Sequence, residues 1–259
     1  MDKVTSKDGT VITFDRLGSG PAVILVSGGS VDKSSNASLA ENLASKFTVY
    51  NYDRRGRGES GDTPPYAVQR EIEDIEAVIG AAGGQAFLYG SSSGAVLALE
   101  AARSGIPVVK LAMWEPPYSP DENARRPPAD TAEVFARLVS EGRRGDAVEY
   151  FMSKVVGLPD EFVAGARSAP WWPWQEALAH TLAYDATIMG DYLIPVERVS
   201  TVTTPTLVLA GGASFGPLIE TAKKLADILP NGEYRELPGQ THDVAGEVLA
   251  PALAEYFGR

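Results

Sequence analysis

The sequence contains no cysteine and only two histidines, and both scarcities limit its chemistry. Without cysteine the chain has no disulfide, no thiolate nucleophile and no cysteine-ligated zinc. Any histidine chemistry must use His180 or His242. With so few ligands of these types we expect no metal site, and no motif of the sequence requires a cofactor.

The chain also lacks an excess of positive charge and a long apolar run. It has 23 Lys and Arg against 34 Asp and Glu, a net charge of −11, which argues against nucleic acid and anionic membranes as partners. The longest aliphatic run, residues 22–26, is far too short to cross a membrane. The N-terminal segment has no apolar region typical of a signal peptide. We therefore expect a cytoplasmic protein that is a monomer or a homodimer.

What the sequence does contain is a regular alternation of strand and helix patterns. Short apolar runs predict buried strands, and amphipathic or small-residue segments between them predict helices. This alternation predicts an α/β fold with a doubly wound, mostly parallel sheet. The predicted strands are 11–14, 22–26, 47–52, 86–89, 108–114, 206–210 and 234–237, and the predicted helices are 67–82, 96–102, 217–229 and 247–257.

The middle of the chain breaks this alternation. Residues 118–200 begin with a stretch rich in Pro, Arg and Asp and then become helical in pattern, without a buried strand run. We therefore expect a core formed by residues 1–117 and 201–259, with residues 118–200 as a helical lid inserted between two strands of the sheet.

Residues 90–94 read Gly-Ser-Ser-Ser-Gly between a buried strand and a helix. A nucleophile on a sharp strand-to-helix turn needs small neighbours two positions away on both sides, and the glycines supply them. Ser92 would then be exposed at the carboxyl end of the sheet. The N–H of Ser93, at the start of the helix, would point at a developing oxyanion.

A general base is expected after the last strand. His242 follows Gly239 in the loop between that strand and the last helix, where an imidazole can take the seryl proton and return it to the leaving group. The competing histidine, His180, lies in the helical insertion, and we expect a polar position on a lid helix for it.

Together these motifs resemble the α/β-hydrolase fold superfamily, in particular its serine esterases and cofactor-free haloperoxidases. The resemblance rests on Ser-Gly-Gly at 27–29, Tyr-Asp-Arg-Arg-Gly-Arg-Gly-Glu-Ser at 52–60, the turn at 90–94 and the segment 239–242, all in the family's order. It implies two oxyanion donors, the N–H groups of Gly29 and Ser93. Family members often have histidine at the positions occupied here by Ser27 and Ser91.

The acid of the expected triad departs from the family pattern. Where an aspartate commonly follows the strand at 206–210, this chain has Ser214, which cannot supply the charge that stabilises an imidazolium. Some members instead use an acid after the strand next to the nucleophile, and Glu115 occupies that position. Asp185 or Asp191 from the insertion, or no acid at all, are alternatives. Asp243 is adjacent to His242 and poorly placed to bond its Nδ1.

Two further patterns need an interpretation. Residues 56–61 match Gly-x-Gly-x-x-Gly, but they lead into Thr-Pro-Pro and not into a helix, so we predict no dinucleotide site. Arg54, Arg55 and Arg57 are interpreted as structural ion-pair partners. Aromatic rings are expected to line an apolar substrate pocket or to pack the lid: Tyr118, Trp171, Trp172, Trp174 and Phe215.

The sequence thus predicts a serine hydrolase that cleaves a small to medium hydrophobic ester or lactone through an acyl-enzyme. Two alternatives remain, motivated by the serines at 27, 91 and 214: a lyase or cyclase on the same fold acting on a biosynthetic intermediate, or a binding protein that has lost catalysis.

Overall fold

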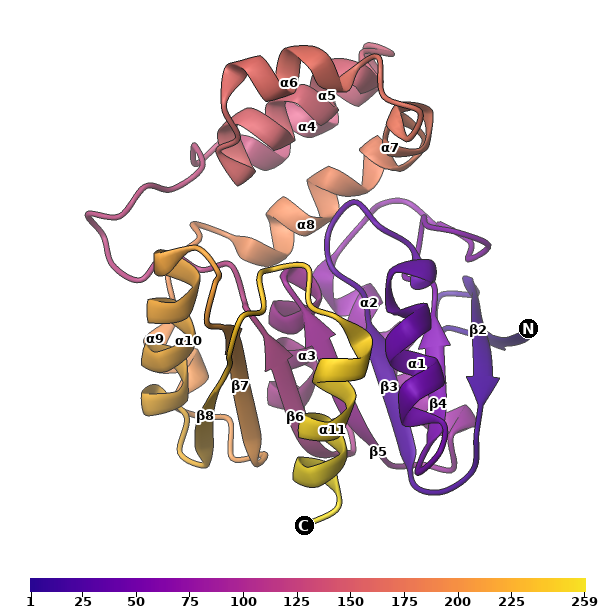
Figure 1. Ribbon diagram of the computed structural model, residues 1–259. Coiled ribbons are helices and arrows are strands. Elements are labelled where there is room, and N and C mark those ends of the chain that lie inside the picture. Colours follow the sequence, from indigo (N-terminus) through magenta and orange to yellow (C-terminus); the bar gives the residue numbers. More distant parts are fainter.

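An eight-stranded sheet forms the centre of the molecule in the computed structural model, which describes residues 1–259 (Figure 1). The spatial order is β1-β2-β4-β3-β5-β6-β7-β8, and only β2 runs antiparallel to its neighbours, β1 and β4. The predicted doubly wound, mostly parallel sheet is therefore confirmed. The strands are β1 (Asp2–Thr5), β2 (Val11–Leu17), β3 (Ala22–Val26), β4 (Thr48–Tyr52), β5 (Ala86–Ser91), β6 (Val108–Trp114), β7 (Thr206–Gly211) and β8 (Gly232–Leu237).

Helices cover both faces of this sheet, which explains why its central strands are continuous apolar runs. One face carries α1 (Ala37–Leu43) and α11 (Gly246–Phe257), which lie side by side in front of the sheet in Figure 1. The opposite face carries α2 (Val68–Ala81), α3 (Ser93–Arg103) and α10 (Gly216–Ile228). Each layer has its own apolar core against the sheet. The strand β1 and the helix α1 were not expected from the sequence.

A separate group of helices lies over the edge at which the parallel strands end (Figure 1). It enters after β6 and returns before β7, and Ser119 and Leu193 form a bridge where the two connections run side by side. Its members have their own apolar core around Phe135 and Trp172. They are α4 (Thr131–Ser140), α5 (Arg144–Tyr150), a π-helical turn (Phe151–Val156), α6 (Asp160–Ala166), α7 (Trp172–Leu178), a 3-10 turn (Ala179–Thr181) and α8 (Leu182–Met189).

The packing places the end of this helical insertion before α9, earlier than the sequence pattern predicts. The short helix α9 (Val196–Val199) falls within the predicted range 118–200, yet it packs against α3 and α10 and contributes Val199 to the core of the sheet. In the insertion, α8 lies between the sheet edge and the outer helices (Figure 1). It is therefore the element through which the insertion meets the core.

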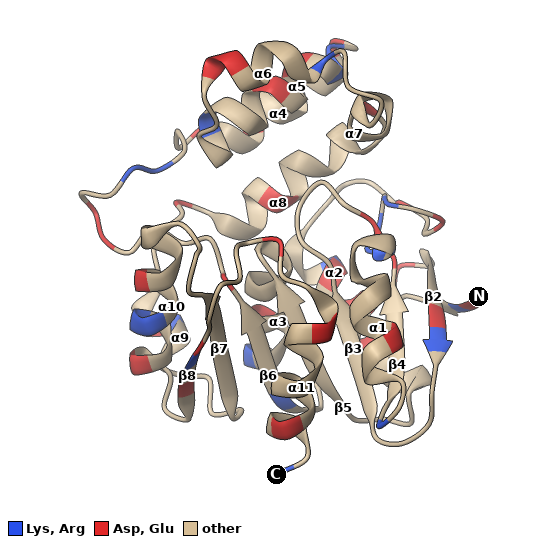
Figure 2. Ribbon diagram, viewed as in Figure 1, with Lys and Arg blue, Asp and Glu red and all other residues tan.

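Charged residues are dispersed over this framework. Figure 2 shows Asp and Glu on helices of the sheet layers and of the insertion, with Lys and Arg scattered among them. None of the helices has the length and apolar character needed to cross a membrane.

Candidate active site

Ser92 occupies a sharp turn between β5 and α3. Its backbone has φ 53° and ψ −128°, a region that side-chain-bearing residues rarely adopt, so the turn is strained. A Cβ on Gly90 would run into the Gly94 carbonyl, and a Cβ on Gly94 would run into the carbonyls of Val26 and Ser27. Both glycines are thus required by close backbone approach. The turn is held further by the Ser92 N–H, which donates to the Trp114 carbonyl at 2.8 Å.

His242 lies in the loop between β8 and α11, and its side chain is 48% exposed. Its carbonyl accepts a hydrogen bond from Nε1 of Trp114 at 2.9 Å, which ties this loop to the end of β6. Nδ1 of its ring lies 2.7 Å from Oε2 of Glu115. Because Nδ1 is engaged by a carboxylate, it carries the proton, and Nε2 is the nitrogen left to act as a base.

Glu115 follows β6 directly and is fully buried. Its second carboxylate oxygen, Oε1, accepts the Gly211 N–H at 2.8 Å. Burial by itself raises the pKa of Glu115, but its hydrogen bonds, first that with His242, lower the pKa below the ordinary value. The side chain is therefore an ionised carboxylate with both oxygens in use, oriented toward the histidine.

The other acids considered from the sequence are engaged elsewhere. Asp191 accepts the Leu193 N–H at 3.0 Å, and Asp185 forms ion pairs with Arg54 and Arg57. The structure thus brings His242 together with Glu115 and with neither of these residues.

The loop after β3 lies against the nucleophile turn. A Cβ built on Gly28 would be 3.2 Å from the Cβ of Ser92, and one built on Gly29 would be 3.4 Å from Oγ of Ser93. Ser93 is the first residue of α3 and is buried. The two backbone amides predicted as oxyanion donors therefore come from segments that touch each other beside Ser92.

A buried charge cluster lies next to this loop, and sequence reasoning did not identify the partners of its arginines. Arg54 forms two hydrogen bonds with Glu71, at 2.7 and 2.8 Å, and one with Asp185 at 2.9 Å. Arg57 binds both oxygens of Asp185, at 2.8 and 2.9 Å. All four side chains are buried.

The interpretation of Arg54, Arg55 and Arg57 as ion-pair partners is confirmed. The link from Arg57 to Asp185 in α8 has no sequence signal, because the two residues are 128 positions apart.

The aromatic residues predicted to line a pocket fall into two groups. Tyr118 is buried in the core of the sheet, and Trp172 is buried in the core of the insertion, where Arg167 stacks on its ring at 5.7 Å. Trp171, Trp174 and Phe215 are 39%, 38% and 72% exposed. The exposed rings are the ones available to a ligand, and pocket lining stays a prediction for all five.

His180 does not take part in this constellation. Its Nδ1 lies 3.0 Å from a guanidinium nitrogen of Arg144, another residue of the insertion. Burial and the nearby Arg144 lower the pKa of His180 below its ordinary value. No group of three or more His, Asp or Glu side chains is arranged to hold a metal ion.

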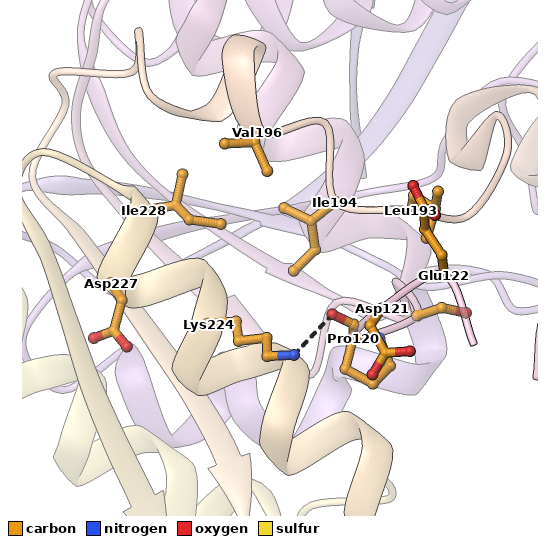
Figure 3. A pocket seen from close by; sticks show the side chains of 10 residues that line it. Pro120, Asp121, Glu122, Leu193, Ile194, Val196, Lys224, Asp227 and Ile228 are labelled. Atoms are coloured by element: carbon orange, nitrogen blue, oxygen red, sulfur yellow. Dashed lines mark hydrogen bonds between the residues drawn. The ribbon is translucent and has the colours of Figure 1, made fainter. Parts of the chain in front are cut away.

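A surface cavity of about 450 Å³ lies elsewhere, at the junction of the insertion and the core (Figure 3). It is lined by residues 119–122, by Leu193, Ile194 and Val196, and by α10. Nζ of Lys224 in α10 donates to the Pro120 carbonyl at 3.1 Å. Ser92, Glu115 and His242 are not among its lining residues. The cavity is therefore separate from the candidate active site.

Comparison with known proteins places the chain in a family. The model of the "Alpha/beta hydrolase family" matches residues 23–252. An alpha/beta hydrolase from Sphaerobacter thermophilus is 54% identical in sequence, with a TM-score of 0.92 over 99% of this chain and 100% of that chain.

More distant structures share the fold. A thermophilic esterase from Thermogutta terrifontis is 22% identical, with a TM-score of 0.75 over 99% of this chain and 97% of that one. The enol-lactonase from Burkholderia xenovorans is 19% identical, with a TM-score of 0.71 over all of both chains.

Among curated proteins, the uncharacterized hydrolase YraK of Bacillus subtilis is 35% identical over 96 residues, which are 36% of this chain and 35% of that protein. The alignment therefore spans only about a third of either partner. The family model and the 54% identical structure cover nearly the whole of this chain. The chain belongs to the alpha/beta hydrolase family.

Proposed function

We propose that the protein is a serine hydrolase that cleaves a small to medium hydrophobic carboxylic ester or lactone, with Ser92 as nucleophile, His242 as base and Glu115 as the acid of the triad. The observation that carries the proposal is the 2.7 Å bond between Nδ1 of His242 and the buried carboxylate of Glu115. It supplies the charge and the tautomer that Ser214, at the usual aspartate position, cannot provide.

In the acylation step, Oγ of Ser92 attacks the substrate carbonyl while Nε2 of His242 takes the hydroxyl proton. The C–O bond forms as the carbonyl π electrons move to oxygen. The N–H groups of Gly29 and Ser93 donate to this oxyanion. When the tetrahedral intermediate collapses, the alkoxide leaves and receives the proton from Nε2. The Glu115 carboxylate stabilises the imidazolium between these two transfers.

Deacylation repeats the sequence with water in place of the seryl hydroxyl. Nε2 of His242 removes a proton from water, the hydroxide adds to the acyl carbonyl, and the proton returns to Oγ of Ser92 as the carboxylic acid leaves. In a lactone the leaving alkoxide stays attached to the acyl chain, and the product is a hydroxy acid. The same residues serve both substrates.

Paired arginines and exposed aromatic rings support the proposed substrate class. Arg54, Arg55 and Arg57 are paired with carboxylates of the protein, so none of the three is free to bind a substrate anion. The exposed rings of Trp171 and Trp174 provide apolar contact area on the insertion. An uncharged, hydrophobic ester fits these features better than a polyanionic one.

The test is covalent labelling with a fluorophosphonate, read by intact mass and peptide mapping, together with hydrolysis of p-nitrophenyl esters of increasing acyl length. We expect labelling of the unmodified protein at Ser92 alone, and loss of labelling in Ser92→Ala and His242→Ala. Ester turnover should be lost in the same two variants. His180→Ala is the matched histidine control and should label like the unmodified protein.

Absence of a Ser92 adduct in folded protein would refute the serine-hydrolase proposal. Ligand-dependent thermal stabilisation without turnover would then indicate a binding protein. Turnover of a substrate that survives Ser92→Ala would indicate a lyase or cyclase.

A further inference from the structure

Arg54 and Arg57 hold the loop that carries the Gly29 amide. Arg57 donates through Nη1 to the Gly28 carbonyl, and Arg54 donates through Nη1 to the Ser27 carbonyl at 3.2 Å and to the Gly28 carbonyl at 3.4 Å. Both guanidinium groups are buried and planar, so each fixes its acceptor in direction as well as in distance.

Fixing this carbonyl also fixes the amide that follows it. The Gly28–Gly29 bond is trans, because the only cis peptide bond in the chain joins Pro64 and Pro65. In a trans peptide unit the C=O and the N–H point in opposite directions. With the Gly28 carbonyl turned toward Arg57, the Gly29 N–H is turned away from the cluster. The direction of the Gly29 N–H is thus set by the contact that the Gly28 carbonyl makes at the opposite edge of the same peptide unit.

The arginines are in turn positioned by a residue of the insertion. Asp185, in α8, binds Arg57 through both oxygens and Arg54 through Oδ1. The same Oδ1 accepts a hydrogen bond from Oγ of Ser93 at 2.8 Å. Ser93 and Gly29 are the two residues whose N–H groups form the proposed oxyanion site. One carboxylate therefore connects both halves of that site.

We propose that Asp185 is a positioning residue for the oxyanion site, through which the insertion sets the reactivity of Ser92. The inference rests on the proposed serine-hydrolase function. Asp185 acts on the Gly29 amide through Arg57 and the Gly28 carbonyl, and on the Ser93 amide through the Ser93 hydroxyl. The insertion is then part of the catalytic apparatus and not only a cover over the substrate.

A second contact from the insertion reaches the same loop. Oγ of Ser30 donates to Oε1 of Gln175 in α7, and Nε2 of Gln175 donates to the Ser30 carbonyl at 3.2 Å. Ser30 has φ 58°, a conformation that needs such support in a residue with a side chain. The segment 27–30 is therefore held both by Gln175 of the insertion and by the arginines.

The test compares Asp185→Asn with Tyr184→Phe, its neighbour on α8. Tyr184 also joins the insertion to the core, through a 2.7 Å hydrogen bond to Asp62 and a stack on Tyr66, but its hydroxyl forms no hydrogen bond with segment 27–30. Both variants are assayed for acylation of p-nitrophenyl butyrate and for inhibition by an alkyl trifluoromethyl ketone and by the methyl ketone of the same chain. The trifluoromethyl ketone forms a hemiketal oxyanion with serine, whereas the methyl ketone reports ground-state binding.

For Asp185→Asn we expect acylation to fall about 10- to 100-fold with KM changed less than about threefold, since complete loss of one oxyanion donor lowers kcat by about 10²–10³. The ketone ratio, which is the inhibition constant of the methyl ketone divided by that of the trifluoromethyl ketone, should fall by the same factor. For Tyr184→Phe all values should stay within about threefold. Removing a negative charge would strengthen oxyanion binding if only charge mattered, so a loss identifies positioning.

An unchanged ketone ratio in Asp185→Asn, or an equal loss in Tyr184→Phe, would overturn the proposal while leaving the serine-hydrolase function intact. If the unmodified protein itself forms no Ser92 adduct, both proposals fall together. Ser93→Ala breaks the link to Asp185 from the core side and keeps the backbone N–H. It carries the test if Asp185→Asn does not fold, with an expected loss in the ketone ratio of about threefold to tenfold.

Discussion

Replacing Glu115 by glutamine changes one carboxylate oxygen into an NH2 group, and the neighbouring Gly211 amide decides where that group points. The Gly211 N–H, 2.8 Å from Oε1, can only donate. It therefore selects the rotamer with the amide oxygen toward Gly211 and the NH2 group toward His242. Nδ1 of His242 must then accept a hydrogen bond, which moves the ring proton to Nε2. In this tautomer the nitrogen that should take the Ser92 proton is already protonated.

The expected loss of acylation rate follows from this change of tautomer. Loss of the correct tautomer in a serine protease triad lowers kcat by about 10⁴. The His242 side chain is 48% exposed, so water can bind the ring in place of the introduced amide and restore part of the population with Nε2 unprotonated. We expect a loss of about 10³ to 10⁴ in acylation rate, which corresponds to about 4 to 5.5 kcal/mol in the barrier.

The assay is stopped-flow acylation with a p-nitrophenyl ester, with thermal unfolding to verify the fold. Asp243→Asn is the matched control, because Asp243 adjoins His242 in the chain but does not bond its Nδ1. It should change the rate by less than about threefold. A Glu115→Gln variant that keeps more than a tenth of the activity would refute the assignment of Glu115 as the acid that orients His242.

Three other predictions concern packing, pH and substrate contact. Gly94→Ala drives a Cβ into the carbonyls of Val26 and Ser27 and should destabilise the fold by about 1 to 3 kcal/mol, seen as a lower Tm in circular dichroism; an unchanged Tm would contradict the packing. Burial raises the pKa of Asp185, but its arginine partners lower it by more, to below 3.8. Its contribution to stability is therefore present above about pH 3.8 and lost as pH falls through the lowered pKa. The free energy of unfolding, measured in urea, should fall on acidification by less in Asp185→Asn than in the unmodified protein. An equal fall in both proteins would disprove this. Trp174→Ala should raise KM for long acyl esters by about threefold to tenfold with little change in kcat; an unchanged KM would remove this ring from the substrate pocket.

Much of the core was predictable because its signals are local. The strand at 22–26 and the helix at 67–82 have apolar patterns set by the faces they bury, and the structure places them at Ala22–Val26 and Val68–Ala81. The turn around Ser92 was predictable because close backbone contact requires its two glycines. Glu115 was one of several acids that the sequence left open for His242. Chain order favoured it, since Glu115 comes directly after β6 and His242 lies in the loop after β8, so that both reach the same sheet edge.

The remainder depends on contacts that no local pattern records. The strand β1 (Asp2–Thr5) is polar and takes its structure from pairing with β2. The helix α1 (Ala37–Leu43) has only seven residues and is stabilised by packing on α11. Asp185 is buried because two arginines 131 and 128 positions away neutralise it, and one sequence does not reveal such a pairing.

The bridge between Ser119 and Leu193 brings the two ends of the insertion together at one point of the sheet edge. A segment attached in this way can be exchanged for another without disturbing the order of the strands, which makes it a convenient place for evolution or engineering to alter substrate preference. Asp185 limits that freedom. A replacement segment would need its own acid facing Arg54 and Arg57. Without one, Arg57 would be left buried with no carboxylate partner, and Arg54 would keep only Glu71. In this protein, a graft that keeps α8 and exchanges only α4 to α7 should preserve reactivity more readily than one that replaces the whole insertion.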